Sequence, residues 1–247
     1  MSSCPNFIGL ECKKVRRTGF GPAFLAGALL AAAFPVIQMA ARTELFLSLP
    51  ETPVKILLDA NWQLMAMLNI LLVITGACLL YHTEYAEHAI LKMCMLPIRE
   101  SSLYAAKAIL LAGMCLAALL IEAAVVILCG LYWFPGADAA GMLAEAGRHF
   151  GVSLLLTLPV VSVSLGIASA FENMWVSLGI GVVCVFTATL LPTDVWILSL
   201  FPYALPFQTV SGLSAQAVRS YLLAGAAETL VFSAAEALFL RIRKLWM

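Results

Sequence analysis

The sequence predicts an all-α integral membrane protein with six transmembrane helices. Of its 247 residues, 63% are hydrophobic and only 11% are charged, and the mean hydropathy is +0.99. A soluble domain is about a quarter charged and just under half apolar, so this chain lies outside the soluble class. Helices are expected as the spanning elements, because a helix satisfies its own backbone hydrogen bonds where water is absent.

Six apolar runs are long enough to cross a membrane, since about 20 helical residues span a hydrocarbon core of ~30 Å. These runs cover residues 20–41, 61–81, 104–131, 149–171, 174–192 and 218–240. Only Glu172 and Asn173 separate the fourth run from the fifth, so we expect a tight helical hairpin there. Residues 1–247 are interpreted as a single transmembrane domain.

The lysines and arginines are divided unevenly between the two sides that these runs define. With the N-terminus inside, ten basic residues lie on the inner side and four on the outer side. The inner ones are Lys13, Lys14, Arg16, Arg17, Lys92, Arg99, Lys107, Arg241, Arg243 and Lys244, and the outer ones are Arg42, Lys55, Arg148 and Arg219. An excess of basic residues marks cytoplasmic segments, so both termini are expected in the cytoplasm.

Two further segments flank the spans. Residues 1–19 place Phe7, Ile8, Cys12 and Val15 roughly on one helical face and the four basic residues on the other, which predicts an interfacial N-terminal helix in the headgroup layer. A solvated basic tail is the alternative. Residues 190–216 begin with "LLPTDVWILSLFPYALPF", whose three prolines forbid a continuous helix and whose aromatic residues favour the interface. We expect an outer re-entrant segment of short helices there, and an apolar loop is the alternative.

Charge gathers in the predicted cytoplasmic loop, residues 82–102. The stretch "YHTEYAEHAILKMCMLPIRESSLYAAK" (81–107) contains six charged residues and two of the three histidines of the chain. Its residues recur at helical spacing until Pro97 interrupts the pattern, which predicts a short helix followed by an elbow. A solvated connector without further function would fit the same pattern.

The stretch "EYAEHAILKMCMLPIRESSLYAAK" (84–107) resembles the loop between the second and third spans of ABC-2 type transporter permeases. The resemblance extends to "ECKKVRR" (11–17), to "FENMWVSLGIGVV" (171–183) and to the aromatic segment 190–207. Within that family the chain looks most like the small permease subunits that accompany lantibiotic-immunity and bacteriocin-export ATPases of Gram-positive bacteria. Relatives often have a Ser-Arg pair after the proline, whereas Ile98-Arg99 follows Pro97 here.

The resemblance implies an ABC-2, type V exporter-like permease of the bacterial plasma membrane. Its loop helix would couple to a separate cytoplasmic ABC ATPase subunit, and the residues in question are Glu84, Tyr85, Glu87, His88, Leu91 and Lys92. Two ATPase copies and a second permease subunit, identical or a sister chain, would complete an exporter in contact with membrane lipid. The cargo would be an antimicrobial peptide or a related hydrophobic or amphipathic compound, and a multidrug or lipid exporter subunit is the alternative.

Several other classes of function are disfavoured by missing motifs. The sequence has no GxxxxGK[ST] phosphate-binding loop, so ATP hydrolysis is expected from a partner and no cofactor is expected in this chain. It contains neither HExxH nor GxSxG, which disfavours an intramembrane enzyme. The seven cysteines form no CxxC pair and are expected to be reduced structural thiols, not metal ligands. The zero net charge and the lack of a basic groove disfavour nucleic-acid binding.

Three carboxylates lie within apolar runs, where an ionised group costs a few kcal/mol and is a functional candidate. Glu236 lies about one turn from Arg241 and is expected to pair with that basic cluster. Glu122 and Glu228 are interpreted either as hydrogen-bonded structural groups or as a polar patch on a substrate path or permease interface. An ion-gradient-driven secondary transporter that uses them is the alternative class, although no internal repeat supports it.

Overall fold

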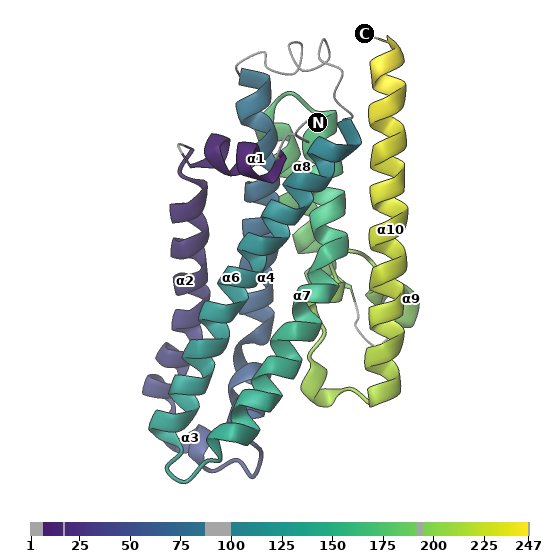
Figure 1. Ribbon diagram of the computed structural model, residues 1–247. Helices are drawn as coiled ribbons and strands as arrows, with labels where there is room; N and C mark the ends of the chain where they lie inside the picture. The colour runs from purple at the N-terminus through teal and green to yellow at the C-terminus, as the bar shows by residue number, and fades with distance from the viewer. Residues whose placement is uncertain (1–6, 17, 87–99, 192–194, 247) are drawn as a thin grey trace, which may run out of the picture.

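The computed structural model describes residues 7–16, 18–86, 100–191 and 195–246, and this part of the chain is all-helical (Figure 1). The long helices are α2 (Phe20–Ala41), α4 (Pro53–Ala86), α6 (Glu100–Trp133), α7 (Ala139–Ala170) and α10 (Ala215–Trp246). The shorter elements are α1 (Phe7–Val15), α3 (Thr43–Leu47), α8 (Met174–Leu190), α9 (Trp196–Ser199), η1 (Leu205–Phe207) and η2 (Val210–Gly212). Among the described residues, five helices have the length and hydropathy of a membrane span.

The all-helical class is confirmed, whereas the predicted count of six spans is not, because only five helices of the described residues meet the criteria of a span. The predicted fifth span, 174–192, corresponds to α8, which has 17 residues. At 1.5 Å per residue α8 rises about 25 Å, less than the ~30 Å of a hydrocarbon core. Leu191, which follows it, has an extended backbone with ψ 131°. The residue before a proline is expected to adopt this conformation, so Pro192 explains the early end.

Helix α2 has the bounds of its predicted run, and the other four long helices are longer than their apolar runs predicted. Helix α4 begins at Pro53, well before residue 61, and α7 begins at Ala139, well before residue 149. Asp138 caps α7 by accepting hydrogen bonds from the backbone N–H groups of Ala140 and Gly141. Hydropathy reports where a helix is apolar, whereas caps of this kind determine where it begins.

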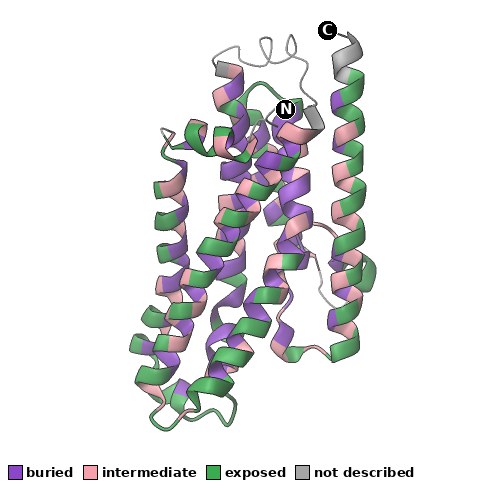
Figure 2. Cartoon of the chain, in the orientation of Figure 1, coloured by how far each residue is buried: buried purple, intermediate pink, exposed green. Residues whose placement is uncertain are grey.

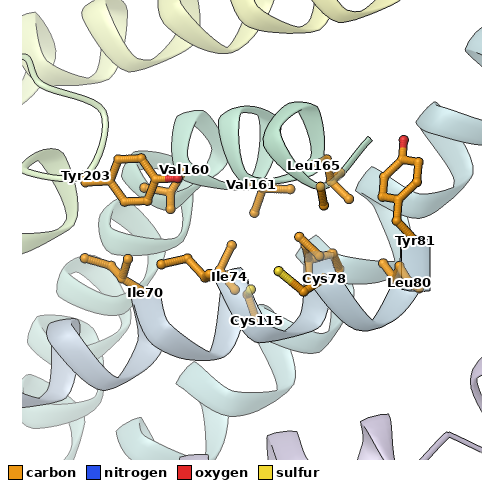
Figure 3. Packing of buried hydrophobic residues seen from close by; sticks show 14 of the residues in the cluster. Ile70, Ile74, Cys78, Leu80, Tyr81, Cys115, Val160, Val161, Leu165 and Tyr203 are labelled. Carbon is orange, nitrogen blue, oxygen red and sulfur yellow. The ribbon is translucent and has the colours of Figure 1, made fainter. Parts of the chain in front are cut away.

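Helix α4 lies at the centre of the bundle and packs against α2, α6, α7 and α8. Figure 3 shows Ile70, Ile74 and Cys78 of α4 facing Val160, Val161 and Leu165 of α7, with Cys115 of α6 and Tyr203 closing the cluster. Glycines bring the helices close together, as is common in membrane bundles. A Cβ atom added at Gly181 of α8 would lie 2.5 Å from Ile74 Cγ2, and one at Gly27 of α2 would lie 2.5 Å from Leu72 Cδ2.

The bundle has two distinct ends (Figure 1). Helix α1, the turn between α7 and α8, and the C-terminal end of α10 lie at one of them, the α1 end. Helix α3 and the turn between α6 and α7 lie at the other, the α3 end. This is the grouping of segments that the basic residues predict, and the cytoplasmic assignment of the α1 end stays a prediction.

The described part of segment 190–216 folds into α9, η1 and η2, which are short as its prolines predict. Tyr203 is 1% exposed, and its hydroxyl lies 3.1 Å from Ser164 Oγ of α7. The indole Nε1 of Trp62 in α4 donates a hydrogen bond to the carbonyl of Pro206 at 3.0 Å. The segment is therefore held against α4 and α7, and its placement at the outer face stays a prediction.

Burial follows the bundle architecture (Figure 2). Purple buried stripes face the centre of the bundle, and α10 is largely exposed along its length. Five cysteines of the described part of the chain are free thiols: Cys12, Cys78, Cys115, Cys129 and Cys184. Within that part, no group of three or more His, Cys, Asp or Glu residues could hold a metal ion.

Candidate functional site

Two lysines and two glutamates from three helices meet at the α1 end of the bundle. Glu11 and Lys14 lie one turn apart on α1, Glu84 lies in the last turn of α4, and Lys107 lies early in α6. Lys107 Nζ is 2.6 Å from Glu84 Oε1 and 3.0 Å from Glu11 Oε2. Lys14 Nζ is 2.9 Å from Glu84 Oε1 and 2.8 Å from Glu11 Oε1. We call these four residues the ion-pair cluster.

Most of the ion-pair cluster is withdrawn from water. Glu11 and Lys107 are each 1% exposed and Glu84 is 5% exposed. Charges are tolerated at such burial only when they are paired and hydrogen-bonded, and here each carboxylate accepts from both lysines. The Lys107 ammonium also lies 5.3 Å from the ring centroid of Tyr81, a cation–π distance. Two positive and two negative charges therefore balance within one buried group.

Lys14 is the member of the cluster nearest to solvent. Burial on its own would lower the pKa of Lys14. The hydrogen bonds and charges of Glu11 and Glu84 outweigh that effect and raise its pKa. Lys14 is therefore a cation at neutral pH.

The local sequence of α1 places its two members of the cluster on the inner face. Glu11 and Val15, four residues apart, are both buried against the bundle, whereas Lys13 is exposed. Helix α1 lies across the end of the bundle, and α2 then runs along it (Figure 1). Gly19 makes this change of direction possible, because its φ of +75° lies in the left-handed region that favours glycine.

The predicted coupling residues are divided between the described helices and the segment 87–99. Helix α4 continues to Ala86 and α6 begins at Glu100, so both ends of the predicted loop 82–102 belong to long helices. Glu84 lies inside the ion-pair cluster and not on the surface where a docking residue was expected. Glu87, His88, Leu91 and Lys92 lie outside the described residues.

Tyr85 begins a second polar connection at the same end. Its hydroxyl donates a hydrogen bond of 2.5 Å to the carbonyl of Ser169 in α7. Ser169 Oγ donates in turn to Glu236 Oε1 of α10. Glu236 is 6% exposed and faces α7 through this contact, and its expected pairing with the basic residues around Arg241 stays a prediction. The α4, α7 and α10 helices are linked through these three side chains.

Glu122 and Glu228 occupy different environments and are not brought together by a shared partner. Glu122 of α6 is fully buried and accepts a hydrogen bond of 3.0 Å from Asn69 Nδ2 of α4. Its second oxygen, Oε1, has no hydrogen-bond partner among the described residues. Glu228 is half-buried on α10, and its buried Oε2 likewise has no partner in the described part of the chain.

Lys14 and Lys107 were predicted only to lie on the inner side, and no partner was predicted for Glu11. A signal for their pairing was nevertheless present. Glu11 is the single acidic residue before the first span, and Lys107 lies inside the apolar run 104–131. A lone carboxylate on an apolar helix face and a lone lysine in an apolar run each require a partner of opposite charge.

A known protein family matches the part of the chain that contains the ion-pair cluster. A family model described as ABC-2 family transporter protein matches residues 7–188, from the start of α1 into α8, and thus covers well over half of the chain. The matched range contains the whole ion-pair cluster and both ends of segment 87–99. No curated protein and no solved structure matches the chain. The chain therefore belongs to the ABC-2 family, as a multi-pass permease subunit of an ABC transporter in the plasma membrane that works with an ABC ATPase subunit.

Proposed function

We propose that this permease subunit serves an ATP-driven exporter that expels antimicrobial peptides or related amphipathic compounds. The α1 end faces the cytoplasm, and segment 87–99 docks onto the ATPase. The observation that carries this proposal is the buried ion-pair cluster, which joins α1 to both helices that flank segment 87–99.

The cluster supports coupling because it closes the base of that segment. Glu84 precedes it and Lys107 follows it, and their charged atoms are 2.6 Å apart. Because this ion pair joins α4 to α6, a force applied to segment 87–99 moves both helices together and does not pull them apart. Packed helices transmit such displacement with little compression. In this arrangement Glu87, His88, Leu91 and Lys92 contact the ATPase, Glu84 anchors the base, and Tyr85 passes the movement to α7.

The surface of α1 supports its placement in the headgroup layer. Ile8 and Leu10 are 42% and 45% exposed, next to the exposed Lys13. Apolar side chains beside a cation suit a helix that lies in the interface with its charge among anionic lipids. One face of α1 would then contact the headgroups of the inner leaflet, while its other face contributes Glu11 and Lys14 to the ion-pair cluster.

A groove between α7 and α10 supports an amphipathic cargo. Its volume is about 340 Å³, and its walls are mainly apolar, with Ile167, Phe232 and Phe239 among them. Glu236 places a carboxylate in this apolar setting. A compound with an apolar body and a basic group would match both properties. A second permease subunit would cover other parts of α10, where Leu223, Leu230 and Val231 are exposed.

The experiment compares cells that express the permease with its ATPase, the permease alone, and the permease with an ATPase whose phosphate-loop lysine is replaced. Only the first strain should survive an increased dose of a cationic antimicrobial peptide. The purified permease alone should hydrolyse no ATP, because it has no phosphate-binding loop. Protection against uncharged lipid-like drugs, with none against the peptide, would contradict the peptide assignment and favour a multidrug or lipid exporter.

A further inference from the structure

A pocket with charged walls lies at the α3 end, far along the bundle from the ion-pair cluster. Its volume is about 390 Å³, and it is formed by α4, α7 and η2. Glu145, Arg148 and His149 of α7 line it together with Ser211 of η2. Leu58 of α4 is among its apolar wall residues. Nothing in the proposed export function uses these side chains.

His149 is the unusual residue of this pocket. It is 2% exposed, and neither of its ring nitrogens has a hydrogen-bond partner among the described residues. Its ring packs edge-on against Trp62, with ring centroids 4.3 Å apart and an interplanar angle of 90°. A buried imidazole without a hydrogen-bond partner is destabilising. A ligand that supplies this hydrogen bond would therefore bind more tightly.

The charges of the pocket lie side by side and include an unused cation. Arg148 is exposed and forms no ion pair within the described part of the chain. Glu145 is half-buried, and its Oε1 accepts one hydrogen bond of 2.9 Å from Thr52. Ser211 Oγ is engaged with Asp59 at 2.8 Å. The pocket thus offers one guanidinium and one carboxylate to a ligand, which matches a zwitterion.

The depth of the pocket follows from the charge pattern of two helices. After Asp59, α4 contains no Asp, Glu, Lys or Arg until Glu84, and after Arg148 none occurs in the chain until Glu172. Both uncharged stretches have the length of a span, since about 20 residues cross ~30 Å of hydrocarbon. Asp59 and Arg148 therefore mark the same membrane boundary at the α3 end, and the pocket lies at the level of the lipid headgroups.

We propose that this pocket binds the head group of phosphatidylethanolamine. The guanidinium of Arg148 holds the phosphate, which also gives the His149 ring a hydrogen-bond acceptor. The ammonium of the head group lies against the carboxylate of Glu145. The shared chemistry is a phosphate ester joined to a primary ammonium, and the position of the pocket at headgroup depth identifies a membrane lipid as its source.

The test measures lipid retention by the purified full chain in detergent, using native mass spectrometry. Phosphatidylethanolamine, phosphatidylcholine and phosphatidylglycerol with identical acyl chains are added in turn, and soluble phosphoethanolamine is added in a separate arm. We expect preferential retention of phosphatidylethanolamine, because choline offers no N–H donor and glycerol offers no cation to Glu145. Arg148→Ala should weaken that retention about tenfold or more, since it removes a charge-assisted hydrogen bond.

Two further variants make the result specific. Arg219→Ala, which removes another exposed cation predicted on the same side, should retain the lipid as the unmodified chain does. Glu145→Gln should abolish the preference for phosphatidylethanolamine over phosphatidylglycerol. Equal retention of the three lipids, or equal effects of the two arginine variants, would overturn the proposal. Binding of soluble phosphoethanolamine as tightly as the lipid would overturn the assignment of a membrane source.

Discussion

Replacing Lys107 with methionine tests whether the ion-pair cluster holds the α1 end together. The change removes the contacts of 2.6 Å and 3.0 Å to Glu84 and Glu11 and leaves two buried carboxylates with Lys14 alone. Breaking a buried pair by removing one partner costs about 3–5 kcal/mol, because the remaining charge stays buried without compensation. In the double variant Lys107→Met/Glu11→Gln, one lysine and one glutamate of the cluster remain, so their charges balance. We expect this variant to recover about two-thirds or more of the lost unfolding free energy.

The free energy of unfolding is measured in mixed micelles by denaturant titration, with circular dichroism as the signal. Lys55→Met is the matched control, because it breaks a pair of similar length, 2.6 Å, between two residues at the surface. That control should change stability little, since exposed pairs contribute little. If Lys107→Met destabilises the chain no more than Lys55→Met does, or if the double variant loses the full sum of the single effects, the cluster does not stabilise the fold.

Three further predictions concern orientation, docking and pH. In intact cells, the exposed thiol of Cys12 should resist a membrane-impermeant maleimide while an Ala139→Cys variant at the α3 end is labelled, and the opposite pattern would refute the cytoplasmic α1 end. Glu87→Lys should leave membrane insertion intact and weaken co-purification with the ATPase. Glu145→Lys at the α3 end should change neither, and equal co-purification of the two variants would refute docking through segment 87–99. Because the pKa of Lys14 is raised above its usual 10.5, its contribution to stability is complete below pH 10.5 and is lost as the pH rises through the raised value. Stability measured from pH 8 to 12 should therefore fall at the alkaline end, and less so in Lys14→Met.

Hydropathy and charge were sufficient to predict the helical class and the grouping of segments at the two ends of the bundle. They located α2, α4, α6, α7 and α10, because a span must be apolar over its whole crossing. They overestimated the length of α8. Leu191 and Pro192 extend the apolar run, although the helix ends before them. Composition over a window does not register such a backbone restriction.

The site was harder to predict because its members come from distant parts of the sequence. Glu84 was identified as a charged residue of the loop, but its burial depends on Lys107 and on α1 folding back over α6. The hydrogen bond from Ser169 to Glu236 joins α7 to α10, and the position of Glu236 along its own helix does not predict it. Which side chains of two helices pair depends on how the helices pack against each other. The periodicity of one helix does not predict this packing.

The short α8 creates a hydrophobic mismatch within a single subunit. A bilayer in contact with a helix of about 25 Å must either thin around it or leave its final carbonyl groups to be covered by protein. Tyr203, Ala204 and Leu205 are each at most 3% exposed, and Tyr203 belongs to the same buried cluster as Val185 and Ala188 of α8. We therefore expect the bilayer to be thinner beside α8 than beside α4 or α7, whose 34 and 32 residues are more than enough to cross it.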